Sequence, residues 1–490
     1  MKNNYEKIGN IAKDSIILTV VRCITLLTSM VQTMLLSRVM TLGEYGSYSS
    51  LLIIISIGTT FSGLGLSNAI NYFYNKENND FNKKHKYVDT IFALTLVVGI
   101  IAALIIYFMR FYIVDYYKNS VLLSLIIYIC FRPLFSNSIS LYQSLYISIG
   151  KSKTIAIRNF LISVVQVVLV PFIFYLTRNL KYVLIVQVIL DFLQIIYFGF
   201  DFNKKSMKIN IKLYNWNLCS IILKYSIPLG LALMLGTLFK ESDKLVIGRL
   251  MGSEKLAIYT NMSKQLPFEF IVTSFTAVIT PLMVRLLNTD KNSAIKVWKN
   301  YLKFGYFSTW ILCFGAIVCA KELLLFLYSN TYISGLNIFI IYLFVEMFRY
   351  TYFGLILTSY GKTKFVLLSS AISLIANIIL NIIFYKLIGF AGPAIASLLC
   401  TLFMGLIQLN VSCHLLNVKL FDVLDIKDMI ILLIKLIFVG TIVYIFKIFA
   451  YKIFNNYVII LIGCYGIFVF INLLINKNKI LLMLRNLKGD

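Results

Sequence analysis

Four charged residues lie within five positions of a long apolar segment, residues 223–250: they are Lys240, Glu241, Asp243 and Lys244. A charge near the centre of a membrane helix costs at least ~2.5 kcal/mol, so these side chains need polar surroundings. Lys240 and Lys244 share one helix face, and Glu241 precedes Lys244 by three residues. The cluster either neutralises itself and snorkels to the outer interface, or lines a cavity. We favour the cavity, in which the lysines attract an anion and the carboxylates hold them or bind a coupling ion.

Other charged residues within apolar segments are further candidates for such a cavity. Arg22 stands alone in the first apolar segment, where it would face a wet cavity or an anionic group, or pair with an acid such as Asp191 or Glu269. Arg132 and Arg285 are weaker candidates for cavity residues, because each could reach an interface. Asp191 and Glu269 are isolated acids that could serve as proton or cation sites.

Glu346 and Arg349 lie three residues apart in one apolar segment, so they can neutralise each other. We therefore expect a structural ion pair there rather than a binding site.

Residues that support enzymatic chemistry are scarce. The chain has two histidines, and its eight cysteines form no CxxC pair, which argues against a metal site and against histidine-based catalysis. No nucleotide-binding loop, paired glycosidase carboxylates or nucleophile motif is present. The sequence thus predicts no enzyme, no catalytic residue and no cofactor, and any energy for transport would come from an ion gradient, the membrane potential or substrate flux.

The composition explains where these residues must lie. Of 490 residues, 60% are hydrophobic and 13% are charged, about half the charged share of soluble proteins. This predicts an all-α polytopic membrane protein. The net charge of +26 is spread over short loops, which favours membrane topology and contact with anionic lipids over nucleic-acid binding.

Windows of about 20 apolar residues predict fourteen membrane helices. Lysine and arginine collect at the N-terminus, after even-numbered helices and at the C-terminus, so the positive-inside rule places both termini in the cytoplasm. The expected spans are 15–37, 46–70, 88–109, 121–146, 155–176, 182–201, 223–250, 257–287, 302–320, 336–358, 365–386, 391–415, 429–449 and 457–475.

An internal repeat relates the two halves of the chain at an offset of 211 residues. It pairs SRVMTLGEYGSYS at Ser37 with GRLMGSEKLAIYT at Gly248, and Gly150-Lys-Ser-Lys with Gly361-Lys-Thr-Lys. Each copy holds six helices, so the two copies share one orientation, as in transporters that bind substrate between parallel halves. We expect an N-lobe at 1–212, a C-lobe at 213–423, and an appended helix pair with a cytoplasmic tail at 424–490.

These segments resemble a known family. LSRVMTLGEYGSYS is similar to the R-x-L-G-x-x-x-Y-G signature of polysaccharide exporters, SDKLVIGRLMGSEKLAIYT is similar to its second-half counterpart, and IGFAGPAIAS is similar to the entry to their twelfth helix. With fourteen expected helices, the whole chain resembles the multidrug/oligosaccharidyl-lipid/polysaccharide (MOP) exporter superfamily, and within it the Wzx-like flippases rather than the multidrug (MATE) branch.

The resemblance implies a flippase that carries polyprenyl-pyrophosphate-linked oligosaccharide, an O-antigen or capsular repeat unit, to the outer leaflet of a bacterial inner membrane by alternating access. Such proteins use a cationic central cavity for the head group, and Arg22 and Lys240 match positions where those cavities carry basic residues. Expected partners are the lipid-linked substrate, membrane lipids, a coupling ion (Na⁺ or H⁺), and a polysaccharide polymerase and glycosyltransferases.

Two alternatives remain open from the sequence. The first is a cation-coupled drug or metabolite exporter of the same fold, which typically relies on acidic cavity residues. The second is a non-transporting membrane scaffold of a polysaccharide assembly complex, against which the charges within the membrane segments argue.

Overall fold

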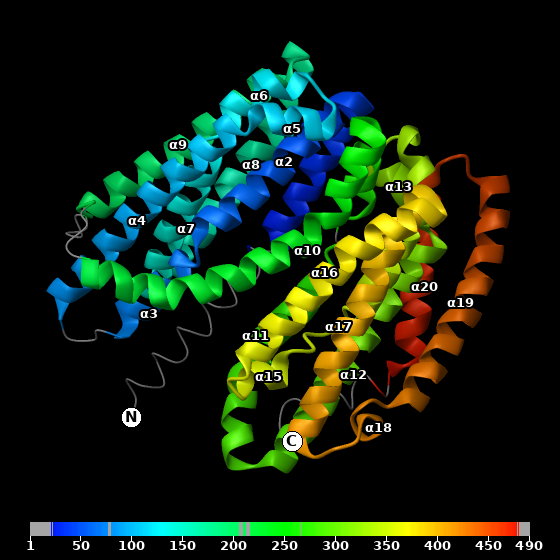
Figure 1. The fold of residues 1–490 in the computed structure, drawn as a ribbon. Helices are drawn as coiled ribbons and strands as arrows, with labels where there is room; N and C mark the ends of the chain where they lie inside the picture. Colours follow the sequence, from blue (N-terminus) through cyan, green and yellow to red (C-terminus); the bar gives the residue numbers. More distant parts are fainter. Residues whose placement is uncertain are drawn as a thin grey trace. The chain divides into compact units, whose positions relative to one another are not determined.

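The structure is a computed structural model that describes residues 21, 23–76, 80–204, 209–211, 216–264, 266–477 and 479, with the backbone alone at 203, 204, 269 and 270. Regular structure in these residues is helical, without a strand. A first helix at Cys23–Val39 precedes the labelled ones. Those in the first part of the chain are α2 (Leu42–Gly63), α3 (Leu66–Lys76), α4 (Phe81–Phe108), α5 (Arg110–Tyr117), α6 (Val121–Ile129), α7 (Arg132–Ser148), α8 (Ser152–Thr177), α9 (Leu180–Lys204) and α10 (Trp216–Met262) (Figure 1).

The helices of the second part of the chain follow in chain order. They are α11 (Glu269–Thr289), α12 (Lys291–Val318), α13 (Ala320–Leu327), η1 (Asn330–Gly335), α14 (Leu336–Phe348), α15 (Leu355–Ser359), α16 (Thr363–Ile388), η2 (Gly389–Ala391), α17 (Gly392–Leu416), α18 (Leu420–Val423), α19 (Ile426–Ile453) and α20 (Tyr457–Ile475).

Twelve helical stretches of the described residues are long and apolar enough to cross a membrane. One of them, Thr363–Leu416, holds both α16 and α17, which are separated at Gly389, where a φ of 74° favours glycine. Counting these two separately and adding the shorter apolar helix at Cys23–Val39 gives the fourteen helices expected from the sequence. The prediction of an all-α, multi-pass membrane protein is therefore confirmed.

Several expected spans are interrupted where the sequence pattern is continuously apolar. The expected span 46–70 breaks at Leu64 and Gly65, which both have positive φ. The break follows from packing, because a methyl group at Gly65 would lie 2.6 Å from the Ser226 carbonyl oxygen of α10. Similarly, the expected span 257–287 is divided between two helices: its first residues belong to the end of α10, and the rest belong to α11.

The chain divides into two compact units: the first unit is Met1–Ala257 and the second unit is Ile258–Asp490. The division falls within α10, five residues after Gly252, whose φ of 78° interrupts the helix. In the 211-residue repeat, Gly252 corresponds to Thr41, where the chain enters α2. The expected domain boundaries at 212/213 and 423/424 rest on the sequence repeat and stay predictions.

In the first unit, the two signature segments are joined through one asparagine. Asn119 Nδ2 donates to Ser47 Oγ and to Ser253 Oγ, both at 2.8 Å. Next to this junction, Arg249 Nη1 donates to the Asp115 carbonyl oxygen at 2.6 Å. The signatures at Ser37 and Gly248 thus meet at one point, which supports a structural role for Arg249.

Gly46 allows this junction to form. A methyl group on Gly46 would lie 1.9 Å from the Ser253 carbonyl oxygen, whereas Gly43, one helical turn earlier, has no atom within 4 Å of the same position. The glycines of the signature therefore have different roles, and only Gly46 is required for close helix packing.

We predict that Gly46→Ala destabilises the protein because α2 and α10 must separate, at the ~1–3 kcal/mol typical of overpacking. The measurement is the thermal unfolding midpoint of the detergent-purified chain. Gly43→Ala is the matched control and should leave the midpoint unchanged or raise it slightly, since alanine favours the helix. Equal midpoints for the two variants would contradict the close contact at Gly46.

In the second unit, α12 forms one core with α19 and α20, to which Trp298, Leu436 and Phe468 contribute. A buried ion pair lies beside this core. Glu322 of α13, 1% exposed, accepts from Lys447 Nζ at 3.1 Å and from the Tyr451 hydroxyl at 2.6 Å. The helix pair at the end of the chain is therefore joined to its unit by charge as well as by apolar contact.

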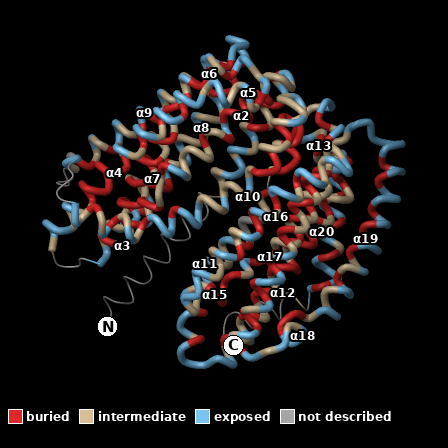
Figure 2. The backbone as a smooth tube through the Cα atoms, viewed as in Figure 1, coloured by how far each residue is buried: buried red, intermediate tan, exposed pale blue. Residues whose placement is uncertain are grey.

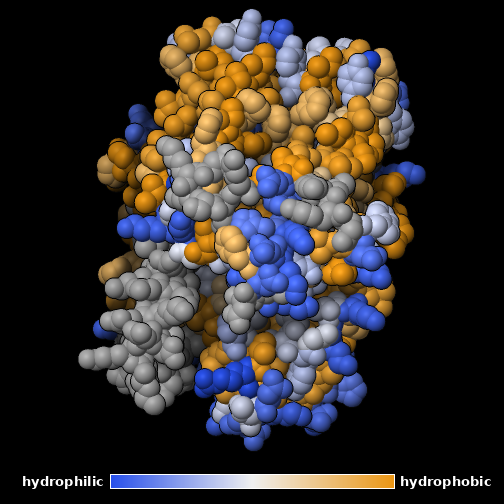
Figure 3. All heavy atoms as spheres, turned by 90° about the vertical axis from the view of Figure 1, so that its left-hand side faces the viewer, coloured by the Kyte–Doolittle hydropathy of each residue, from blue (hydrophilic) through white to orange (hydrophobic). Residues whose placement is uncertain are grey.

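Burial is concentrated on one side of most helices. Figure 2 shows buried residues along α4 and α7, whereas much of α19 is exposed. Figure 3 shows hydrophobic side chains over the upper part of the face in view and many hydrophilic side chains over its middle and lower parts. The hydrophobic surfaces fit contact with lipid, which requires helices whose backbone groups are satisfied internally.

Candidate functional site

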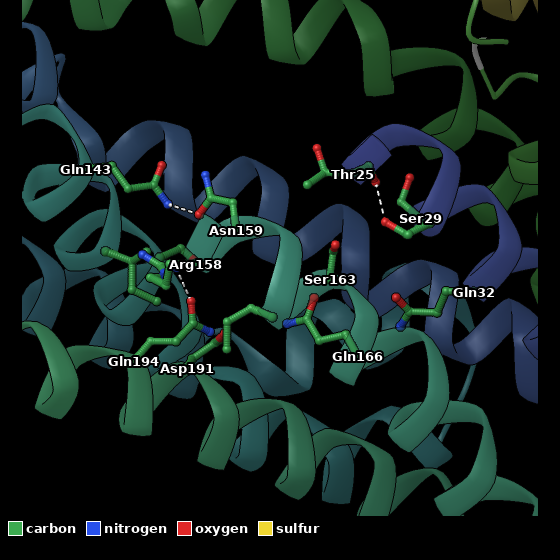
Figure 4. A pocket seen from close by; sticks show the side chains of 14 residues that line it. Thr25, Ser29, Gln32, Gln143, Arg158, Asn159, Ser163, Gln166, Asp191 and Gln194 are labelled. Atoms are coloured by element: carbon green, nitrogen blue, oxygen red, sulfur yellow. Dashed lines mark hydrogen bonds between the residues drawn. The ribbon is translucent and has the colours of Figure 1, made fainter. Parts of the chain in front are cut away.

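A polar pocket of about 390 Å³ lies within the first unit, bounded by the helix at Cys23–Val39 and by α7, α8 and α9 (Figure 4). Every described residue that lines it is polar or charged except Ile139 and Ile162. The others are Thr25, Thr28, Ser29, Gln32, Ser136, Gln143, Arg158, Asn159, Ser163, Gln166, Asp191 and Gln194. Polar groups inside a membrane bundle are costly and mark substrate or ion pathways, so this pocket is the candidate functional site.

Arg158 of α8 is the cation of the polar pocket. Its side chain is nine-tenths buried, and its guanidinium lies 4.3 Å from the centre of the Phe198 ring. Nη2 donates to Gln194 Oε1. Its Nε and Nη1 are buried and have no hydrogen-bond partner among the described residues. A buried charge with unmade hydrogen bonds is costly, and a bound anion would relieve that cost.

Asp191 of α9 is held at the edge of the pocket by Arg132 of α7. Arg132 Nε donates to Asp191 Oδ2 at 3.1 Å, and its Nη1 donates to Gln187 Oε1 at 2.8 Å. Gln187 in turn donates to the Tyr48 hydroxyl at 2.8 Å. This chain of hydrogen bonds fixes Arg132 on Asp191, in line with the requirement that buried charges be paired.

The charges around the pocket do not cancel. Asp191, 6% exposed, interacts electrostatically with both Arg132 and Arg158. Asp201, also on α9, accepts a hydrogen bond from the Tyr146 hydroxyl. Among the described residues, the partly buried Arg132 and the buried Arg158 therefore share the buried Asp191, and these three side chains carry one excess positive charge.

Amides and hydroxyls make up most of the remaining lining. Gln143 Nε2 donates to Asn159 Oδ1 at 3.4 Å, a long hydrogen bond. Figure 4 shows Ser163 and Gln166 of α8 on the same side of the pocket, across from Ser29. Groups that both donate and accept suit a hydroxyl-rich ligand better than an apolar one.

The charged cluster of α10 lies elsewhere in the first unit. Lys244 Nζ pairs with Glu241 Oε2 at 2.8 Å and donates to the Lys240 carbonyl oxygen at 3.2 Å. Asp243 is 2% exposed, whereas Lys240 is exposed. The pair of Lys244 and Glu241 fits the interpretation in which the cluster neutralises itself. The exposed Lys240 is compatible with the interpretation in which the cluster lines a cavity. A role of the cluster in binding stays a prediction.

The other expected site residues are distributed over the chain. Arg22 lies outside the described residues, and the side chain of Glu269, at the start of α11, is not described either. Arg285 is exposed on α11. Glu346 Oε1 accepts the Leu266 N–H at 2.6 Å, and the expected pairing of Glu346 with Arg349 stays a prediction.

Arg158 is the residue that sequence reasoning missed. The positive-inside rule assigns it, with Lys151 and Lys153, to a loop. In the structure it lies six residues after the start of α8, a rise of ~9 Å. The sequence did hold a signal, namely several glutamines within apolar segments, among them Gln166 and Gln194. A search for windows of about 20 apolar residues does not detect such single polar residues.

We predict that Arg132→Met strongly destabilises the first unit, because it leaves the buried Asp191 carboxylate without its partner, at a cost of about 3–5 kcal/mol. The measurement is the thermal unfolding midpoint of the purified chain. The double variant Arg132→Met/Asp191→Leu should recover most of that loss, because an apolar pair replaces the ion pair. Additive losses in the double variant would contradict the pairing.

Sequence comparison gives the family. A family model described as "Polysaccharide biosynthesis protein" matches residues 35–336. The chain belongs to this family. The match includes the polar pocket residues from α7 to α9 and the α10 cluster.

The chain is also similar to an uncharacterized membrane protein, MJ1375, from Methanocaldococcus jannaschii. It is 29% identical over 214 residues, which cover 42% of this chain and 50% of the relative. The chain thus matches about half the length of that relative.

Solved structures share the fold. The lipid II flippase MurJ, in an inward closed conformation, has a TM-score of 0.73 at 15% identity and covers 95% of this chain and 100% of its own. An inward-facing multidrug resistance MATE transporter of the MOP superfamily has a TM-score of 0.64 at 13% identity and covers 82% of this chain and 98% of its own. A MOP superfamily transporter from Pyrococcus furiosus has a TM-score of 0.54 at 12% identity, with 83% and 95% covered. At these identities the likeness shows the fold, which is the MOP fold expected from the sequence.

Proposed function

We propose that this protein is a flippase that moves polyprenyl-pyrophosphate-linked oligosaccharide, an O-antigen or capsular repeat unit, from the cytoplasmic to the outer leaflet by alternating access. The polar pocket of the first unit is the observation that carries this proposal. It combines a hydroxyl-compatible lining with an excess positive charge, the chemistry that an anionic sugar head group needs.

The family and fold support the same assignment. The family model is described by polysaccharide biosynthesis, and the fold occurs in a lipid II flippase. The lipid tail would stay in the bilayer, which suits the exposed apolar surface of the helices. The protein would then lie in a bacterial inner membrane with cytoplasmic termini, near the glycosyltransferases and polymerase that make and use its substrate.

The alternative of a cation-coupled drug exporter has less support in the described residues. Asp191 is the acid of the polar pocket, and it is already paired with Arg132. A pocket with only two apolar lining residues also offers little to a hydrophobic drug. Coupling to Na⁺ or H⁺ through Asp191, Asp243, Glu241 or Glu269 stays part of the proposal, whereas a scaffold that transports nothing would not need a charged pocket.

A translocation assay tests the proposed function. The full chain is reconstituted into liposomes that contain a fluorescent polyprenyl-pyrophosphate-linked disaccharide, and the fraction accessible to dithionite is followed with time. We expect accessibility to rise from about half to nearly all of the probe, while a fluorescent phospholipid in parallel vesicles stays at about half. No protein-dependent rise for the sugar lipid, together with efflux of cationic dye under an ion gradient, would favour the drug exporter instead.

The α10 cluster has a test within the same assay. Lys240→Ala should slow translocation severalfold if Lys240 lines the substrate path. Lys224→Ala is the matched control, since it removes an exposed lysine from the same helix. Equal rates for the two variants would assign Lys240 to the membrane interface.

A further inference from the structure

The charge balance of the polar pocket specifies the charge of its ligand. Arg132, Asp191 and Arg158 together carry one excess positive charge, and Arg132 is occupied by Asp191 and Gln187. Arg158 is therefore the group left to bind a ligand anion. One carboxylate would neutralise the excess, whereas a diphosphate would replace it with net negative charge in a buried site, at a high desolvation cost.

Arg158 also has unmade hydrogen bonds. Its Nε and Nη1 lie on different edges of the guanidinium, are covered by protein atoms and have no hydrogen-bond partner among the described residues. A carboxylate drawn to this guanidinium would form a charge-assisted hydrogen bond with it. Gln194 and the Phe198 ring hold the guanidinium in place, so little side-chain freedom is lost on binding.

The rest of the lining fits the remainder of a sugar ring. The hydroxyls of Ser29 and Ser163 and the amides of Asn159 and Gln166 surround the space beside Arg158. They can donate to and accept from ring hydroxyls. A volume of about 390 Å³ is near the lower end of ligand pockets, ~300–1,000 Å³, and suits a small head-group segment rather than a long oligosaccharide.

We propose that the polar pocket of the first unit is a subsite for one acidic sugar residue, whose carboxylate is bound by Arg158. The inference rests on the proposed function and adds the charge and class of the head group: the transported glycan contains a carboxylate-bearing sugar. Asp191 and Arg132 act as positioning residues that set the charge around Arg158 and do not contact the ligand.

Direct binding of soluble sugars tests the subsite without transport. Methyl glucuronide and methyl galacturonide are titrated into the detergent-purified full chain, and Kd is obtained by saturation-transfer NMR. Methyl glucoside and inorganic pyrophosphate are titrated in the same way. We expect at least one of the two uronides to bind about tenfold or more tightly than the neutral glycoside, since a charge-assisted hydrogen bond is lost in the latter.

Variants assign the binding to Arg158. Arg158→Gln keeps hydrogen-bonding capacity but removes the charge, so uronide affinity should fall about tenfold or more, to that of the neutral glycoside. Arg178→Gln is the matched control: it removes an exposed arginine at the other end of α8 and should leave affinity unchanged. If Arg158→Gln does not fold, Gln166→Met tests the same lining and should weaken uronide binding severalfold.

Three outcomes would overturn the subsite: equal affinity for uronides and glucoside, uronide binding that is unchanged in Arg158→Gln, or Arg158-dependent binding of pyrophosphate alone. The last would assign the pocket to the diphosphate of the lipid carrier. The translocation assay separates this inference from the proposed function. If the protein translocates the sugar lipid but its uronide binding does not depend on Arg158, the subsite alone is overturned. If uronide binding depends on Arg158 but the sugar lipid is not translocated, the flippase function is overturned.

Discussion

One buried carboxylate shared by a partly buried and a buried arginine is the interaction on which the first unit's chemistry depends. Asp191 is bound by Arg132 and also interacts with Arg158. Hydrogen bonds through Gln187 to Tyr48 hold Arg132 on the acid. The arrangement therefore separates the two arginines: Arg132 joins α7 to α9 through Asp191, and Arg158 is the one for which we propose a ligand.

The fold was largely predictable from the sequence, because the thickness of a bilayer sets the length of each apolar segment. The fourteen expected helices and the family resemblance were correct. The interruption at Leu64 and Gly65 was not predictable, since it arises from close packing of Gly65 against α10 and not from local composition. The interruption of α10 at Gly252, by contrast, lies close to the expected end of a span at residue 250.

The candidate site was predictable only in part. Single charges such as Arg132 and Asp191 were recognised as unusual, but their pairing joins residues 59 positions apart and depends on how α7 meets α9. Arg158 was assigned to a loop because positively charged residues near helix ends usually lie in the cytoplasm. Its burial depends on Gln194 and Phe198 of α9, which no rule based on loop charge takes into account.

The ion pair of Glu322 and Lys447 has a consequence for how this protein could be shortened in evolution. By sequence, the helices after residue 424 resemble an addition to a complete twelve-helix protein. In the second unit, however, a chain that ended before α19 would keep Glu322 in its apolar surroundings without the ammonium and hydroxyl that neutralise it. A chain without α19 and α20 would therefore also need a substitution that removes the buried charge of Glu322. The two last helices thus belong to the second unit as an integral part.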